Sequence, residues 1–137
     1  MKKIVMAAVA TFVVLMATNY LIHGVWLMPD YNAIPLSHRS PEGIQRRFWA
    51  MILSQIFFSA LFAYIYTRGV EKKAWMEQGI RYGILMAFLT IVPTALSEYT
   101  VYIVPYMLVV KWMVAGGIQM ILVGLVVAAI CKDGASS

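Results

Sequence analysis

The sequence has few charged residues and a single cysteine. Only 12% of its 137 residues are Asp, Glu, Lys or Arg, which is about half the charged share of a soluble globular domain. With Cys131 as the one cysteine, the chain can form no internal disulfide and no cysteine-rich metal site. It also lacks a glycine-rich phosphate loop, a nucleophile elbow and a zinc-protease motif. We therefore expect no enzyme of these classes and no bound cofactor.

Long apolar runs fill the chain instead. Apolar residues make up 62% of the sequence. Four stretches are each long enough to cross a hydrocarbon layer of ~30 Å as a helix. They are residues 4–28, 48–66, 82–104 and 112–131. The sequence therefore predicts an all-α polytopic membrane protein: an antiparallel bundle of four transmembrane helices in a single domain, residues 1–137, with the lipid bilayer as its partner.

Flanking residues extend the apolar runs into longer helices. The predicted helices cover about residues 4–28, 41–67, 71–103 and 107–131. Ser40 is a typical N-cap and Pro41 suits the first helical position. Apolar residues recur at helical spacing over 75–80, which predicts that the third helix begins at residue 71. The start of the chain resembles a secretory signal, but its apolar run exceeds a signal core, so we expect a retained helix.

Basic residues are divided unequally between the two sides of the predicted bundle. Seven of the 11 precede the first span, separate the second from the third, or follow the fourth: Lys2, Lys3, Arg68, Lys72, Lys73, Arg81 and Lys132. The other four are Arg39, Arg46, Arg47 and Lys111. The positive-inside rule then places both termini in the cytoplasm of a bacterial cell, with the chain in its cytoplasmic (inner) membrane. Because topology explains the basic residues, the net charge of +5 does not indicate nucleic acid.

Proline and glycine within the spans predict local features of the helices. Pro93 lies in the middle of the third span and should kink it. Five glycines give the third and fourth helices thin faces that other helices can approach closely. They are Gly79, Gly83, Gly116, Gly117 and Gly124.

The two halves of the chain share a weak internal pattern. Residues 25–29 and 101–105 both read Val-aromatic-apolar-apolar-Pro, at the ends of the first and third spans. The second and fourth spans both open with a basic and an aromatic residue, followed seven residues after the aromatic by Gln55 and Gln119. Two repeated hairpins would give this pattern. The usual placement of aromatic, basic and proline residues at membrane interfaces would also give it, and both alternatives stay open.

Five strongly polar side chains lie within the spans, and Glu98 is the only acid among them. At ~1.5 Å of helix rise per residue, their distances from the flanking residues place all of them in the outer half of the bilayer. They are Asn19, His23, Gln55, Glu98 and Gln119. We expect these side chains to form one polar layer.

Glu98 carries the strongest functional signal in this layer. A bare carboxylate is costly in hydrocarbon, so Glu98 should be protonated or paired. His23 matches it in depth, and Lys111 at the interface is the other candidate partner. The layer is either a site for a proton, a cation or a small ligand, or a set of hydrogen bonds between helices.

Metal and haem sites have weaker support. A bis-histidine haem needs two facing histidines, whereas His38 falls in a loop, and His23 alone offers one ligand to a porphyrin-type metal. Asp30, His38 and Glu42 are metal-capable but lack diagnostic spacing. The ten methionines are scattered, as expected for flexible gap-fillers between helices. We therefore expect no metal site.

Several segments resemble a bacterial family. They are Asn-Tyr-Leu-Ile-His-Gly-Val (19–25), Arg-Tyr-Gly (81–83), Val-Pro-Thr-Ala-Leu (92–96) and the glycine-rich fourth helix. With these segments the chain resembles small bacterial inner-membrane proteins of four helices, which are grouped as domains of unknown function. The resemblance implies a fold and a location, and it supplies no catalytic residue.

Three functional hypotheses follow from the sequence. The first is a non-enzymatic accessory or structural subunit of a membrane assembly, because the helices offer thin glycine faces and no catalytic set. The second is a small transporter or channel subunit with a proton-linked polar site at Glu98 and His23. Both predict a homo-oligomer or a larger membrane complex. A membrane enzyme acting on a lipid or quinone is the least supported.

Overall fold

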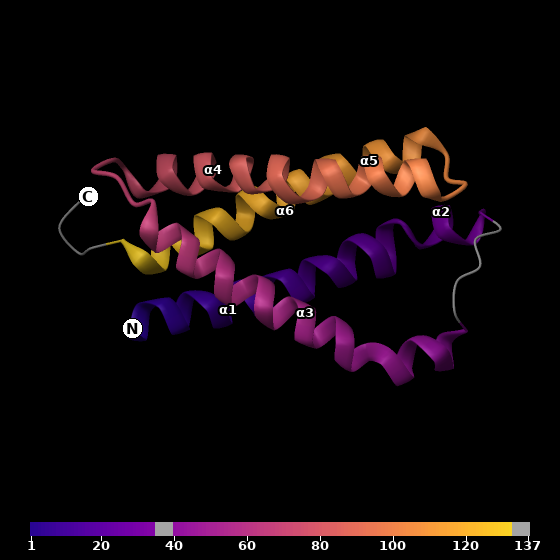
Figure 1. Cartoon of the computed structure of the whole chain (residues 1–137), viewed down its shortest axis with the longest axis horizontal. Helices are drawn as coiled ribbons and strands as arrows, with labels where there is room; N and C mark the ends of the chain where they lie inside the picture. Colours follow the sequence, from indigo (N-terminus) through magenta and orange to yellow (C-terminus); the bar gives the residue numbers. More distant parts are fainter. Residues whose placement is uncertain (35–39, 133–137) are drawn as a thin grey trace.

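The computed structural model describes residues 1–34 and 40–132, and every regular element in these ranges is a helix. Four helical runs are long and apolar enough to cross a membrane (Figure 1). They are Lys2–Trp26, Pro41–Arg68, Trp75–Val101 and Tyr106–Cys131. The predicted all-α, four-helix architecture is therefore confirmed.

Two of the four runs change helical type along their length. Short π-helical segments, η1 and η2, interrupt the α-helices of the first and third runs, and one extra short helix, α2, follows the first run. In chain order the elements are α1 (Lys2–Asn19), η1 (Tyr20–Trp26), α2 (Met28–Asn32), α3 (Pro41–Arg68), α4 (Trp75–Met86), η2 (Ala87–Ile91), α5 (Val92–Val101) and α6 (Tyr106–Cys131).

Helix α2 corrects the predicted loop after the first span. The first helical run ends at Trp26, where residue 28 was expected, and a new helical turn begins at Met28. Pro29 lies in the first turn of α2, where its missing N–H breaks no helical bond. Leu27 joins the two elements: its N–H donates to the carbonyl of Ile22 at 2.8 Å, and its side chain is fully buried.

The start of α3 agrees with the sequence, whereas the start of α4 does not. Ser40 caps α3 as predicted, because its hydroxyl accepts the Gly43 N–H at 3.2 Å and the helix begins at Pro41. The third run was expected from residue 71 but begins at Trp75. The physical reason is a side-chain brace that replaces helical hydrogen bonds with bonds to Gln78.

The brace holds residues 71–73 in an irregular turn. The Gln78 amide donates to the carbonyls of Glu71 and Lys73, both at 2.8 Å, and accepts the Glu71 N–H at 2.9 Å. The Glu71 carboxylate lies 2.9 Å from the Lys73 ammonium and 3.4 Å from the Arg81 guanidinium. The hydrogen bond from Lys73, together with these positive charges, lowers the pKa of Glu71.

Pro93 affects the third run through the segment that precedes it. A proline cannot donate to the carbonyl four residues earlier. The run adopts π-helical geometry over Ala87–Ile91, where the Val92 N–H donates to the Ala87 carbonyl, and α5 then starts with Pro93 in its first turn. A π-helical segment thus lies directly before the α-helical turn that contains Pro93, and the kink predicted at Pro93 stays a prediction.

The four runs pack in the order α3, α1, α6 and α4, with α4 and α5 lying along α6 (Figure 1). We call the end where α1 begins and α6 finishes the terminal end, and the opposite end the α2 end. At the terminal end the Lys3 ammonium lies 3.4 Å from the Lys132 carbonyl. The buried core consists of two clusters, and the larger one lies in this half of the bundle. It comprises Ala7, Leu15, Phe62, Ala63, Tyr66, Met86, Ala87, Met120, Val123, Val127 and Ala128. The smaller cluster lies at the α2 end and comprises Leu27, Ala95, Val104, Leu108 and Val109.

Tyr82 closes the bundle between α3 and α4 in the terminal half. Its hydroxyl donates to the Phe62 carbonyl at 2.7 Å. Its ring packs edge-on against Phe62 and Tyr66, with ring centroids 4.6 and 5.3 Å apart. Near its start α3 is different: its buried residues begin only at Ser59. Helix α3 is therefore buried against the other helices only in the terminal half of the bundle.

The two halves of the chain differ in detail despite their shared sequence pattern. The shared pattern aligns Pro29 with Pro105. The π-helical segment η1 ends at Trp26, close to Pro29, whereas η2 ends at Ile91, well before Pro105. Helix α1 also packs along α6, whereas α3 and α4 meet mainly through the aromatic contacts of Tyr82. The repeat of two hairpins stays a prediction.

Glycines set the closest approach between helices. A Cβ on Gly83 would lie 2.5 Å from the Cα of Ile121, and one on Gly124 would overlap the carbonyl oxygen of Gly79. Gly116 likewise faces the Ile91 side chain at 2.6 Å. Gly117 corrects the prediction, because a Cβ there would meet no described atom within 4 Å. Successive residues point ~100° apart around a helix, so Gly117 faces away from the contact that Gly116 makes.

We predict that Gly124→Ala destabilises the protein and that Gly117→Ala does not. Both changes add the same methyl group to the same helix, so the intrinsic gain in helix propensity is shared. Overpacking against α4 should cost Gly124→Ala about 1–3 kcal/mol of unfolding free energy. Reversible unfolding in mixed detergent micelles measures the difference, and equal stabilities of the two variants would show that α4 and α6 do not meet at these glycines.

Candidate binding cavity

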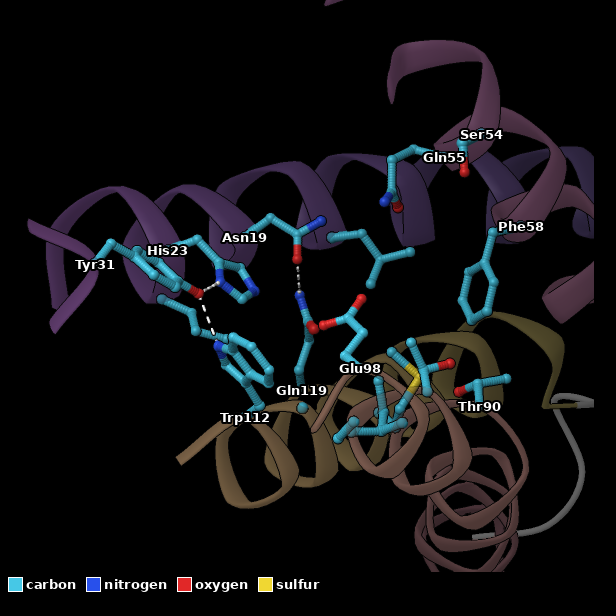
Figure 2. Close-up of a pocket in the computed structure, with 17 residues that line it drawn as sticks. Asn19, His23, Tyr31, Ser54, Gln55, Phe58, Thr90, Glu98, Trp112 and Gln119 are labelled. Carbon is cyan, nitrogen blue, oxygen red and sulfur yellow. Dashed lines mark hydrogen bonds between the residues drawn. The ribbon is translucent and has the colours of Figure 1, made fainter. Parts of the chain in front are cut away.

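The five polar residues within the spans line one cavity near the α2 end (Figure 2). Its volume is about 490 Å³. The residues come from every run: Asn19 and His23 from the first, Gln55 from α3, Glu98 from α5 and Gln119 from α6. The structure thus brings together side chains that the sequence related only by depth.

Asn19 and Gln119 are engaged in holding α1 to α6. The Gln119 amide nitrogen donates to the Asn19 carbonyl oxygen at 2.9 Å and to the Thr18 hydroxyl at 2.6 Å. Thr18 in turn donates back to its own helix, with the Val14 carbonyl at 2.7 Å. Both amide protons of Gln119 are therefore used, and this part of the polar layer links two helices.

His23 belongs to an aromatic network that covers the cavity at its α2 end. The Trp112 indole donates to the Tyr31 hydroxyl at 2.8 Å, and that hydroxyl lies 2.6 Å from Nδ1 of His23. Burial raises the pKa of the Tyr31 phenol, and the nearby Glu98 and Asp30 carboxylates act in the same direction. Tyr31 therefore keeps its proton and can donate it to Nδ1, which leaves the His23 proton on Nε2, at the cavity side of the ring (Figure 2).

Lys111 is paired with Asp30 and not with Glu98. Its ammonium lies 2.8 and 2.9 Å from the two Asp30 carboxylate oxygens. The same ammonium lies 5.9 Å from the centre of the Trp26 ring. This pair fastens α2 to the start of α6 and corrects the expectation that Lys111 could neutralise Glu98.

Of the five polar residues, Glu98 and Gln55 have no side-chain partner in the described part of the chain. Among the described residues, neither the Glu98 carboxylate nor the Gln55 amide makes a side-chain hydrogen bond or ion pair. Both are half-buried, and Figure 2 shows both directed into the cavity from different elements. His23 shares the cavity with Glu98, but its described hydrogen bond goes to Tyr31. The expected pairing of Glu98 with His23 is therefore absent from this part of the chain.

Apolar side chains form the remaining walls. Leu15, Phe58 and Met120 close the cavity toward the terminal end, where they join the buried core. Ser54 on α3 and Thr94 on α5 also line the cavity and are exposed. The cavity therefore reaches the outside of the bundle while it is sealed toward the core.

No cluster of three or more metal-capable side chains occurs within residues 1–34 and 40–132. Asp30 is engaged with Lys111, and His38 lies outside the described residues. The cavity itself offers one carboxylate and one imidazole, Glu98 and His23, which are not in contact through any described bond. The chemistry that this set supports is electrostatic and hydrogen-bonding recognition.

The sequence analysis missed α2 and its contacts. Residues 29–40 fell outside the predicted helices, so Asp30 and Tyr31 were not expected to contact the fourth helix. Pro29 followed by an acidic residue is a helix-start signal that could have revealed α2. The contacts of Asp30 and Tyr31 with α6 span 81 residues, and no local pattern predicts them.

Comparison with protein-family models, with curated proteins and with solved structures finds no match to this chain. The fold defines the class: a multi-pass α-helical membrane protein. Beyond the class, the functional argument rests on the geometry of the cavity.

We predict that Asp30 and Lys111 are energetically coupled. Each side chain is about one-third exposed, at 32% and 33%, so the coupling should be about 1 kcal/mol. Unfolding free energies of Asp30→Asn, Lys111→Met and the double variant measure it. The same cycle on Glu71 and Lys73, which are 52% and 40% exposed, is the matched control and should show less coupling. Additive effects at Asp30 and Lys111 would show that the pair does not fasten α2.

Proposed function

We propose that this chain is a non-enzymatic membrane protein that binds a small organic cation in the cavity, as a transporter or as a subunit of one. The single observation that carries the proposal is the Glu98 carboxylate, half-buried at membrane depth in a cavity and without a partner among the described residues. An acid in that position is costly to keep, and acids within spans commonly mark ion or substrate pathways.

The other side chains of the cavity support a cationic ligand. The Gln55 oxygen can accept a hydrogen bond from an ammonium group that is also paired with Glu98. Both amide protons of Gln119 are donated to Thr18 and Asn19, so Gln119 does not compete with the ligand for Glu98. His23 is held by Tyr31 and can remain neutral beside a bound cation.

The size and walls of the cavity favour an organic cation over a bare metal ion. About 490 Å³ falls within the range of roughly 300–1,000 Å³ that holds small organic ligands. Leu15, Ile22, Phe58 and Ile91 provide an apolar surface for the body of such a ligand. The proposed ligand therefore has an ammonium head for Glu98 and a short hydrocarbon body.

We also propose how the protein is oriented in the membrane and in which membrane it lies. Seven of the 11 basic residues flank the terminal end of the bundle, which supports a cytoplasmic position for both termini. The resemblance to small bacterial inner-membrane proteins supports a bacterial cytoplasmic membrane. The cavity would then lie in the outer half of the bilayer.

We predict that Glu98→Gln abolishes most of the affinity for butylammonium. Losing the charge at nearly constant shape should cost about 2 kcal/mol, or roughly thirtyfold in Kd. Titration calorimetry on the full chain in lipid nanodiscs measures binding, and neutral butanol is the ligand control. Glu77→Gln makes the same change at an exposed acid in the first turn of α4 and should bind as the unaltered protein does. Unchanged binding by Glu98→Gln would overturn the proposal.

A second candidate is an accessory or structural subunit of a larger membrane assembly or homo-oligomer. It is supported by α3, whose large apolar side chains are exposed from its start to the cavity. They are Ile44, Phe48, Trp49, Met51, Leu53, Ile56 and Phe57. The glycine faces no longer support this candidate, because Gly79, Gly83, Gly116 and Gly124 are used inside the chain.

We predict for this candidate that Phe57→Ala weakens the assembly. Phe57 is 61% exposed on α3, and Ile118, which is 63% exposed on α6, is the matched control. Native mass spectrometry after gentle solubilisation should show fewer oligomers or complexes for Phe57→Ala than for Ile118→Ala. A monomer for the unaltered chain, or equal losses for the two variants, would exclude α3 as the assembly surface.

A further inference from the structure

Two buried hydroxyl groups inside the bundle have no hydrogen-bond partner among the residues that the structure describes. Thr11 on α1 is 0% exposed and Ser59 on α3 is 1% exposed. Neither hydroxyl makes a hydrogen bond with any described residue. Four other threonines bond to a carbonyl three or four residues earlier in their own helices: Thr18, Thr67, Thr90 and Thr100. The Thr11 and Ser59 hydroxyls thus forgo a bond that the helix backbone normally accepts.

The two hydroxyls lie on the same helix faces as residues that line the cavity. Thr11 lies one helical turn beyond Leu15, which lines the cavity floor, and Ser59 lies one turn beyond Gln55, which lines its wall. Residues four apart share a helix face. Helices α1 and α3 pack against each other, and both hydroxyls belong to the buried faces of their helices. Two further polar groups, the Thr11 and Ser59 hydroxyls, therefore lie one helical turn beyond the residues that line the cavity.

Water is the ligand that matches these two groups. A hydroxyl both donates and accepts, and buried polar atoms in native proteins nearly always have a protein or water partner. A bilayer core supplies no such partner, whereas the cavity begins one helical turn away and can supply water. Leu15 and Phe58 line the cavity and also pack in the buried core beyond it, so a change of rotamer in these two side chains would give water a way toward the hydroxyls.

We propose that Thr11 and Ser59 form a hydration site that extends the cavity by one helical turn toward the terminal end. Water enters it from the cavity when the floor side chains move. The site rests on the proposed function in one respect: it gives a cation or proton held at Glu98 its next polar position along the bundle. No bond is made or broken in this step, and only hydration changes.

Silver-ion accessibility of introduced cysteines tests the proposal. Cys131 is the one native cysteine, so Cys131→Ser provides the background. Thr11→Cys and Ser59→Cys in the full chain, reconstituted in lipid nanodiscs, are exposed to Ag⁺, a thiol-reactive ion that travels through water. Unreacted thiols are then counted by maleimide labelling after denaturation. Ser54→Cys at the exposed side of the cavity is the positive control.

The matched negative controls are Ala7→Cys and Ala63→Cys, one turn further along the same buried faces and 0% exposed. Thr11→Cys and Ser59→Cys should react roughly tenfold faster than these controls, because reactivity follows the population of the hydrated state. Equal rates would overturn the proposal. If an altered thiol disturbs folding, NMR magnetisation transfer from water to the side chains of Thr11 and Ser59 in the unaltered chain gives a second readout, and no transfer to either side chain would also overturn the proposal.

The outcome is separable from that of the cation proposal. Fast reaction at Thr11→Cys together with unchanged butylammonium binding by Glu98→Gln would support the hydration site and reject cation binding. Slow reaction together with lost binding by Glu98→Gln would confine the ligand to the cavity and reject the hydration site.

Discussion

The close contact of α4 with α6 at three glycines is the constraint on which the rest of the structure depends. Inside a bilayer, packing and not the hydrophobic effect holds helices together, and small residues give the largest contact. Gly79 and Gly83 meet Gly124 backbone to backbone, so the third and fourth runs are pinned together in the terminal half. Beyond this point η2 and Pro93 change the helical geometry of the third run, and α5 carries Glu98 into the space at the α2 end.

The polar groups of that space fall into two sets with different physical roles. Asn19, Gln119 and His23 each make a hydrogen bond between elements: Gln119 donates to Asn19 and Thr18, and His23 bonds to Tyr31. These bonds fix the relative position of α1, α2 and α6, and each contributes only about 0.6 kcal/mol on average in a membrane. Glu98 and Gln55 contribute nothing of this kind, because they have no partner among the described residues. The bonds between helices therefore involve Asn19, Gln119 and His23, whereas the proposed cation binding depends on Glu98 and Gln55.

The depth of each polar side chain along its helix was predictable from the sequence. The direction in which a side chain points around the helix, and the residue with which it pairs, were not. A constant rise per residue placed the five polar side chains at similar depth, and the structure shows them around one cavity. Rotation about the helix axis decides which glycine packs: Gly116 meets Ile91, and Gly117 meets nothing described within 4 Å. The partner of Lys111 depended on α2, which the sequence analysis had treated as loop. Long-range contacts follow from the positions of all helices together, and a single sequence contains little information about them.

The unsatisfied polar groups follow one path through the molecule. Gln55 and Glu98 face the cavity, and Thr11 and Ser59 lie one turn beyond it. Every such group costs stability, about 1–3 kcal/mol when fully buried, and apolar replacements of the same size would remove that cost. Other polar groups in the chain have partners, for example in the Gln78 brace and in the Asp30–Lys111 pair. Polar groups without partners are expected at functional sites, where the demands of function oppose stability. Their alignment along α1, α3 and α5 is better explained by a hydrated route through the bundle than by four independent defects.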